Sequence, residues 1–220
     1  MGKTALIAGA SGLVGSELLK ILLEVSEYEH IIAVVRSPLN ITNTKLEERI
    51  VDFEELAETN GLPTVDDVFC CLGTTIKKAK TQEAMTRIDV DYPIALANLG
   101  KTLGAKQYFV ISSLGADAKS SIFYSRIQGL LEIALKGIGF QTLGIFRPSL
   151  LLGKRREFRI GEAFATVLMP ILSLFMVGEF RKYRGIQARV VALAMFKVAQ
   201  SGNSGVNIYL SDEISKIAGS

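Results

Sequence analysis

The feature that most constrains the fold of this chain is the alternation of short apolar runs with longer stretches of helical spacing. The runs ALIAG (5–9), IIAVV (31–35) and DVFCCLG (67–73) are apolar on both faces, as strands covered from both sides should be. The stretches 16–25 and 81–104 repeat apolar residues at helical intervals. This alternation predicts an α/β fold, a doubly wound parallel-sheet Rossmann fold.

The remaining pattern sets the organisation of the chain. Further strands are predicted at 48–53, 107–113 and 142–148, and a further helix at 125–139. After Pro148 the composition changes to a basic stretch, an apolar run and a final long helix, ARVVALAMFKVAQ. We interpret 1–220 as a single domain with a Rossmann core at 1–148 and a small C-terminal helical lobe at 149–220, which closes over the sheet edge and serves a substrate or partner.

Composition limits the class of protein. The chain has 220 residues, of which 49% are hydrophobic, so it is long enough for one well-formed core. Its net charge of +3 is too small to indicate a nucleic-acid partner. Cys70 and Cys71 are adjacent in an apolar run and are expected to be reduced, which predicts a cytoplasmic location. The single histidine, His30, cannot build a metal site with a second one, so no metal is expected.

The apolar stretch AFATVLMPILSLFMVG, residues 163–178, raises the question whether the chain enters a membrane. It is shorter than the roughly 20 residues of a spanning helix, and Pro170 interrupts it. We therefore expect no integral membrane insertion but a helix packed against the main domain or a partner, buried within a monomer or across a homodimer. The basic RKYR at 181–184 keeps a membrane-surface role as the alternative.

A glycine-rich turn follows the first predicted strand. In GASGLVG, Gly9, Gly12 and Gly15 have the spacing G-x-x-G-x-x-G between a buried strand and an amphipathic helix. Glycine permits the tight turn and the close approach of a pyrophosphate, while the helix N-terminus offers N–H groups to its oxygens. Ser11 can add a hydroxyl group. The sequence thus predicts a dinucleotide site, the alternative being a purely structural turn.

Residues after the other strands refine the predicted cofactor. Arg36 in AVVRSP ends the second strand, where NAD-binding folds usually carry an acidic residue. A guanidinium suits the 2′-phosphate of NADP, so we expect NADP(H), although a solvated arginine is common at a strand end. Asp52 and Phe53, ending the third strand, are expected beside the adenine ring. Leu72, Gly73 and Thr74 end the fourth strand, where the chain and the cofactor are expected to approach closely.

A candidate catalytic pair lies near the fifth strand. Ser113 ends that predicted strand, and Tyr124 stands at the start of the next helix. Such a pair can polarise a carbonyl and pass it a proton. A lysine one helical turn after the tyrosine would hold the nicotinamide ribose and lower the tyrosine pKa, because a cation about 4 Å away contributes roughly 4 kcal/mol before screening. Gln128 stands there instead. It can hydrogen-bond the ribose but supplies no charge.

Six stretches together resemble the atypical short-chain dehydrogenase/reductases, in particular the Tat-interacting oxidoreductase group and its bacterial relatives. They are GASGLVGSELL, AVVRSP, CCLGTTIKKAKTQEAMTRIDVDY, ISSLGADAKSSIFYSRIQGLLE, FRPSLLLGKRREFRIGE and VNIYLSDEI. The resemblance implies an NADPH-binding Rossmann fold with Tyr124 as the acid/base and with Arg36, aided by Ser37, on the 2′-phosphate. It also implies that the pyrophosphate and the rest of the cofactor lie along Ser11, Gly12, Leu13, Val14, Leu72 and Gly73.

Members of this group carry lysine where this chain has Gln128. The source of a positive charge beside Tyr124 is therefore left open. Arg147 ends the sixth strand and is one alternative source of positive charge. The other candidates are Arg155, Arg156 and Arg159 and, after the fourth strand, Lys77, Lys78 and Lys80. A solvated basic surface is the preferred interpretation of these residues.

Three functions remain open on the sequence. The first is an NADPH-dependent reductase of a small carbonyl or enone compound, with Tyr124 as proton donor and Ser113 polarising the oxygen. The second is a catalytically weak NADP(H)-sensing regulatory protein that acts on a partner through 149–220. The third, a structural partner-binding module, is disfavoured because a scaffold needs neither the glycine turn nor Arg36.

Overall fold

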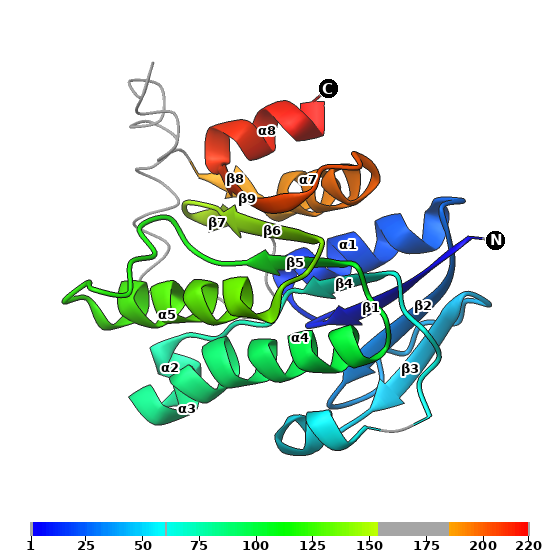
Figure 1. The fold of residues 1–220 in the computed structure, drawn as a ribbon, viewed down its shortest axis with the longest axis horizontal. Coiled ribbons are helices and arrows are strands. Elements are labelled where there is room, and N and C mark those ends of the chain that lie inside the picture. The colour runs from blue at the N-terminus through cyan, green and yellow to red at the C-terminus, as the bar shows by residue number, and fades with distance from the viewer. Residues whose placement is uncertain (1, 60, 154–184, 220) are drawn as a thin grey trace.

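The computed structural model describes residues 2–59, 61–153 and 185–219, and its centre is a seven-stranded, all-parallel sheet (Figure 1). The strand order is β3-β2-β1-β4-β5-β6-β9. The strands are β1 (Lys3–Ala8), β2 (Tyr28–Val35), β3 (Leu46–Ile50), β4 (Asp67–Cys70), β5 (Gln107–Ile111), β6 (Thr142–Arg147) and β9 (Gly205–Leu210). The predicted doubly wound parallel sheet is confirmed.

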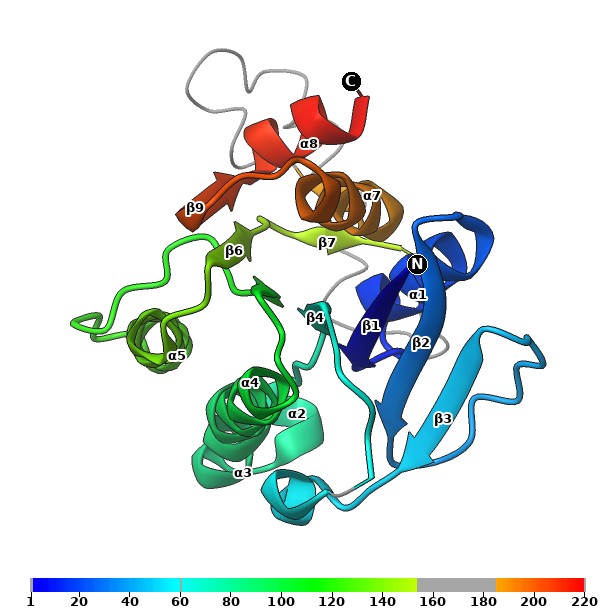
Figure 2. The ribbon, with the colours of Figure 1, turned by 45° about the vertical axis from the view of Figure 1, so that its right-hand side comes forward.

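Helices cover both faces of this sheet (Figures 1 and 2). Those on one face are α1 (Leu13–Glu24), α7 (Ala188–Gln200) and α8 (Ser211–Gly219). Those on the other are a 3₁₀ turn η1 (Phe53–Glu58), α3 (Gln82–Thr86), a π turn η2 (Arg87–Asp91), α4 (Tyr92–Thr102) and α5 (Phe123–Ile138). The short α2 (Ile76–Ala79) follows β4, and β7 (Leu151–Leu152) and β8 (Ile186–Gln187) form a separate parallel pair.

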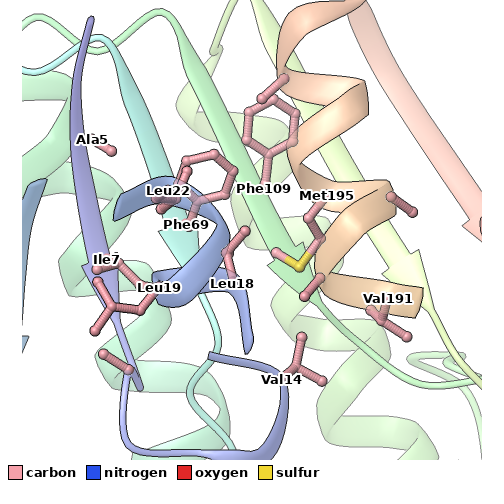
Figure 3. Packing of buried hydrophobic residues seen from close by; sticks show 14 of the residues in the cluster. Ala5, Ile7, Val14, Leu18, Leu19, Leu22, Phe69, Phe109, Val191 and Met195 are labelled. Atoms are coloured by element: carbon pink, nitrogen blue, oxygen red, sulfur yellow. The ribbon is translucent and has the colours of Figure 1, made fainter. Parts of the chain in front are cut away.

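Both faces of the sheet are apolar because its central strands are continuous apolar runs whose successive side chains point to opposite faces. On β1, Ala5 and Ile7 belong to the core under α1 and α7, while Leu6 and Ala8 belong to the core under α4 and α5. In the first core, stacked rings of Phe69 and Phe109, 5.3 Å apart, lie beside Leu18, Leu22 and Met195 (Figure 3). Each such side chain contributes about 1.5–3 kcal/mol to folding by burial.

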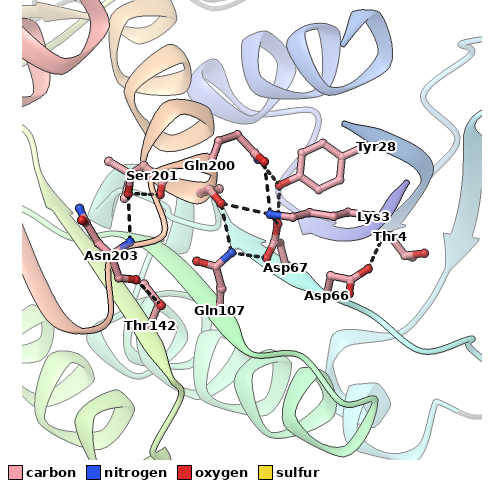
Figure 4. Close-up of polar contacts among 12 residues, drawn as sticks. Lys3, Thr4, Tyr28, Asp66, Asp67, Gln107, Thr142, Gln200, Ser201 and Asn203 are labelled. Atoms are coloured by element: carbon pink, nitrogen blue, oxygen red, sulfur yellow. Dashed lines mark hydrogen bonds and ion pairs between the residues drawn. The ribbon is translucent and has the colours of Figure 1, made fainter. Parts of the chain in front are cut away.

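A buried polar cluster joins the amino ends of the central strands to α7 (Figure 4). Asp67 accepts hydrogen bonds from the Tyr28 hydroxyl at 2.5 Å and the Gln107 amide at 2.7 Å, and pairs with Lys3 at 3.1 Å. Gln200 donates to the Tyr28 hydroxyl at 3.0 Å and accepts from Lys3 at 3.2 Å. No buried side-chain atom of this five-residue cluster lacks a partner, so it acts as a closed structural clamp.

The helix predicted over 81–104 is interrupted by a π turn. Pro93 has no N–H, and its ring excludes the carbonyl of the residue four positions earlier, Asp89. The chain therefore changes from α3 to the π turn η2 before α4 begins at Tyr92. The widened turn places Asp89 in a buried position, 2% exposed, facing α5.

The C-terminal segment contributes to the main sheet. Helix α7 coincides with the predicted final helix, but β9 was not predicted, and it pairs in parallel with β6 along its whole length. The assignment of 149–220 as a lobe for a substrate or partner stays a prediction. The apolar stretch 163–178 lies outside the described residues. Within the described ranges, every helix is too short or too polar to cross a bilayer.

Strand order also locates the place where a ligand can enter. The chain proceeds from β1 outward to β2 and β3, then returns to the other side of β1 as β4. Loops leaving the carboxyl ends of β1 and β4 therefore diverge to opposite faces of the sheet. In open parallel sheets, ligands bind in the crevice at this switch point.

Candidate functional site

The glycine turn crosses the loop after β4 in direct contact. Gly9 has a φ of +80°, a backbone conformation that favours glycine. A Cβ atom on Gly9 would lie 2.4 Å from the Cys71 carbonyl oxygen, and one on Gly15 would lie 2.1 Å from the Gly9 carbonyl oxygen. Neither position can accept a side chain without backbone movement. This crossing lies at the switch point, and backbone atoms rather than side chains line its surface.

The start of α1 presents a positive helix end to this crossing. Gly12 is its N-cap, and no side chain of a described residue caps it; the first turn holds no acidic residue. The N–H groups of that turn are therefore available to an anionic oxygen. Ser11 is exposed, Gly12 and Leu13 are half-buried, and Val14 is buried. These properties fit a pyrophosphate.

Arg36 and Ser37 follow the carboxyl end of β2, the neighbour of β1 in the sheet, and both are exposed. The Arg36 side chain forms no hydrogen bond or ion pair with another described residue. Its guanidinium is thus free to bind a phosphate on this edge.

Asp52 and Phe53 lie beyond the third strand rather than at its end, because β3 stops at Ile50. The Asp52 carboxylate accepts the Glu54 N–H at 3.0 Å and caps η1. Phe53 is 5% exposed and packs against the Tyr92 ring at 5.4 Å. Phe53 is thus a core residue, and the predicted contact of this pair with adenine has no support in these contacts.

The loop after β4 leaves open space beside the crossing. A Cβ atom on Gly73 would meet no described atom within 4 Å, and Gly73 is exposed. Leu72 and Thr74 are half-buried. The Thr74 N–H donates to an Asp89 carboxylate oxygen at 2.8 Å, which fixes this loop to the π turn.

The predicted catalytic region carries two buried polar atoms without a partner. Gln128 on α5 is 4% exposed, and its Oε1 has no hydrogen-bond partner among the described residues; the same holds for Ser113 Oγ, after β5. Leaving each atom unpaired costs about 1–3 kcal/mol, so both fit a site completed by a bound molecule. Tyr124, one helical turn before Gln128, is 39% exposed. The structure therefore places three of the predicted residues, Ser113, Tyr124 and Gln128, at the carboxyl edge of the sheet.

Asp89 is the residue of this edge that the sequence analysis missed. Its second carboxylate oxygen accepts a long hydrogen bond, 3.5 Å, from Gln128 Nε2. Burial raises the Asp89 pKa to about 6, against the opposing effect of the Thr74 N–H bond. The available signal was an acidic residue within an otherwise amphipathic helical pattern, four positions before a proline.

A second buried carboxylate, Glu132, accounts for Arg147. The guanidinium binds Glu132 through Nε at 2.8 Å and Nη2 at 2.6 Å, and the Ser112 hydroxyl donates to the same carboxylate at 2.6 Å. Hydrogen bonding to Glu132 raises the Arg147 pKa. Since its charge is balanced, Arg147 does not replace the missing lysine. Arg155, Arg156 and Arg159 lie outside the described residues, and the exposed Lys77, Lys78 and Lys80 lie on or just after α2.

Comparison with known sequences gives two informative relatives. The chain is 37% identical to the HTATIP2 protein of rat over 167 residues, which cover 74% of this chain and 69% of that protein. It is 30% identical to the mitochondrial FMP52 protein of Eremothecium gossypii over 218 residues, covering 97% of this chain and 91% of that protein. No family model matches the chain.

Comparison with solved structures supports the fold. The Bordetella bronchiseptica enzyme WbmH, solved with NAD⁺, matches with a TM-score of 0.70 at 14% identity, over 100% of this chain and 80% of that one. Human epimerase family protein SDR39U1, solved with NADPH, matches with a TM-score of 0.64 at 16% identity, over 94% and 74% of the two chains. At such identities the likeness concerns the fold alone.

The relatives correct the predicted location. Several FMP52 relatives are named as mitochondrial proteins, which contradicts the cytoplasmic location predicted from Cys70 and Cys71. Both cysteines are free, as expected. Reduced thiols are compatible with more than one compartment inside a cell, so they could not distinguish them.

Proposed function

Because the chain belongs to the family of the HTATIP2 and FMP52 proteins, which are atypical short-chain dehydrogenase/reductases, we propose that it is an NADP(H)-binding oxidoreductase. The proposed reaction is the reduction of a small carbonyl or enone compound. The observation that carries the proposal is the contact between Gly9 and the Cys71 carbonyl at the switch point of the sheet. It is accompanied by two buried polar atoms that lack partners within the described part of the chain.

The cofactor is proposed to lie across the carboxyl ends of β2, β1 and β4. The first turn of α1 would bind the pyrophosphate, and Arg36 with Ser37 would bind the 2′-phosphate. Leu72, Gly73 and Thr74 would line the path toward the nicotinamide half. When bound, NADPH supplies a hydride.

The chain's own residues would handle the proton. Ser113 Oγ, which has no partner among the described residues, can donate a hydrogen bond to a substrate carbonyl oxygen and polarise it. Tyr124, which is 39% exposed, can donate its hydroxyl proton to that oxygen as the carbon is reduced. Gln128 can bind a ribose hydroxyl but cannot lower the tyrosine pKa, so turnover is expected to be slow at neutral pH.

A second function, NADP(H) sensing without efficient turnover, is favoured by one observation. The position of the usual lysine holds Gln128, and the described residue that its side chain hydrogen-bonds is the carboxylate of Asp89 rather than a cation. A site with this electrostatic character suits binding more than proton transfer. Occupancy would then be reported to a partner through 149–220.

The test is a fluorescence titration of the purified protein with NADPH and NADH, beside the variant Arg36→Glu. We expect NADPH to bind at least about tenfold more tightly than NADH, and the variant to lose that preference, because a carboxylate repels the 2′-phosphate. Equal binding of the two nucleotides by wild type and variant would contradict the NADP assignment.

Two further measurements separate the enzyme from the sensor. Oxidation of bound NADPH by small aldehydes or quinones, accelerated in Gln128→Lys, supports the enzyme. A bound cofactor that stays unreactive in both proteins while it changes self-association supports the sensor. If neither nucleotide binds, both proposals fail.

A further inference from the structure

Elementary chemistry fixes the direction of the hydrogen bond between Asp89 and Gln128. An ionised carboxylate, the form of Asp89 at pH 8, only accepts hydrogen bonds, whereas an amide has one donor end and one acceptor end. One Asp89 oxygen is already held by the Thr74 N–H at 2.8 Å. The other can be approached only by the Gln128 amide nitrogen, which lies 3.5 Å away. The Gln128 carbonyl oxygen must therefore point elsewhere.

That carbonyl oxygen is the buried atom without a partner. Gln128 Oε1 is shielded from solvent and forms no hydrogen bond with any residue that the structure describes. Ser113 Oγ, on the loop after β5, is likewise shielded from solvent and has no hydrogen-bond partner among the described residues. Two such atoms, on α5 and after β5, fit a site in which a bound molecule supplies their partners. For a carbonyl oxygen, that partner must be a donor.

We propose that Asp89 is a positioning residue that holds the Gln128 amide nitrogen and so presents the Gln128 carbonyl oxygen to a hydroxyl group of the nicotinamide ribose. This inference deepens the proposed NADP(H) site and depends on it. In place of the lysine donor, the chain has a two-residue unit that accepts a hydrogen bond. The long 3.5 Å contact shortens when the ligand fixes the Gln128 side chain.

The π turn explains why Asp89 can reach α5. The carbonyl of Asp89 is released from the regular helical ladder by Pro93, and the residue lies in the widened turn Arg87–Asp91. This turn contacts α5 directly. Thr74, on the other side of Asp89, belongs to the loop proposed to line the cofactor. Asp89 thus connects two segments of the same candidate site.

The test moves the carboxylate from residue 89 to residue 128 and the amide from residue 128 to residue 89. In Gln128→Glu, two carboxylates face each other, and we expect NADP⁺ to bind at least about tenfold more weakly at pH 8. Adding Asp89→Asn restores an amide donor opposite a carboxylate, with the Thr74 bond kept through the Asn oxygen. Binding should return to within about threefold of wild type, because one oxygen of residue 128 again faces the ligand.

Two controls make the result specific. Asp89→Ala combined with Gln128→Glu removes the same charge without providing a donor, and should leave NADP⁺ binding at least about fivefold weaker than wild type. Adenosine 2′,5′-bisphosphate lacks the nicotinamide half, and its affinity should stay within about twofold in every variant. Both ligands are measured by titration calorimetry, which needs no turnover.

The outcomes are distinct. Rescue by Asp89→Asn but not by Asp89→Ala, confined to NADP⁺, establishes the positioning role. Equal rescue by both substitutions, no rescue, or equal changes for the two ligands overturns it, while wild-type binding of adenosine 2′,5′-bisphosphate keeps the proposed function intact. If wild type binds neither ligand, the proposed function itself is wrong and this inference falls with it.

Discussion

The two ends of the central sheet differ in how completely their buried polar groups are paired. At the amino ends, the Asp67 carboxylate binds Lys3, Tyr28 and Gln107, and every buried atom of the cluster has a partner (Figure 4). At the carboxyl ends, Gln128 Oε1 and Ser113 Oγ have none among the described residues. Since folding favours paired polar groups, the first arrangement serves stability, whereas the second fits the proposed ligand site.

The largest effect should come from breaking the closed end. In Asp67→Ala, the Tyr28 hydroxyl, the Gln107 amide and the Lys3 ammonium lose their common acceptor. We expect the free energy of unfolding to fall by about 3–5 kcal/mol, measured by urea denaturation. The neighbouring Asp66→Ala is the matched control, because Asp66 accepts only an exposed bond from the Thr4 N–H and should cost about 1 kcal/mol or less. Similar losses in the two variants would contradict the clamp.

Asp89→Asn at the open end should have the opposite sign. Burial raises the Asp89 pKa from 3.8 to about 6, so the folded state holds this proton at pH values where the unfolded chain has lost it. Stability therefore falls as pH rises from about 4 to about 6, by about 3 kcal/mol in total, and the penalty remains at pH 7. Asparagine has no proton to lose, so the variant should be more stable than wild type at pH 7 by up to about 3 kcal/mol.

Urea denaturation of both proteins between pH 4 and pH 8 checks the sign. The stability difference should open between about pH 4 and pH 6 and stay constant above. A variant that is less stable at pH 7 would mean that the hydrogen bonds of the Asp89 carboxylate outweigh its burial, and the two ends of the sheet would then be alike.

The smallest effect concerns Gly73, which should matter to the ligand and not to the fold. A Cβ atom there meets nothing within 4 Å among the described residues, so Gly73→Ala should change the free energy of unfolding by less than about 0.5 kcal/mol. If the cofactor passes beside Gly73, the methyl group should weaken NADPH binding by about 1 kcal/mol, or about fivefold.

Gly137→Ala is the matched control, because its added Cβ also has open space but lies near the end of α5. It should leave NADPH affinity unchanged and raise stability by up to about 1 kcal/mol through helix propensity. Equal NADPH affinity in both variants and wild type would place the cofactor path away from Gly73.

Most of the fold was predictable because its signals are local. The buried runs at β1, β2 and β4 are apolar on both faces, and the helix Ala188–Gln200 has regular apolar spacing. β9 was missed because an edge strand is covered less: Val206 and Ile208 are 51% and 37% exposed, and the pairing with β6 joins distant parts of the chain. Its short sequence carries too little information to fix a non-local pairing.

The candidate site was predictable only in part, for the same reason. The glycine turn and the Tyr124–Gln128 spacing are local patterns, and both lie at the predicted edge. The bonds of Asp89 to Gln128 and of Glu132 to Arg147 depend on packing between elements, which no spacing in the sequence reveals. Pro93 was a readable local signal for the break in the helix at 81–104.

The clamp at the amino ends also has a consequence for the order of events during synthesis. Gln200, which Lys3 binds, lies 197 residues after Lys3 in the chain and is therefore synthesised long after it. The full cluster cannot close until residue 200 has been made, so on the growing chain Lys3 can pair with Asp67 but not yet with Gln200. Ribosome-bound chains that end before α7 should therefore be sensitive to proteases, and resistance should appear only once residue 200 is free of the exit tunnel.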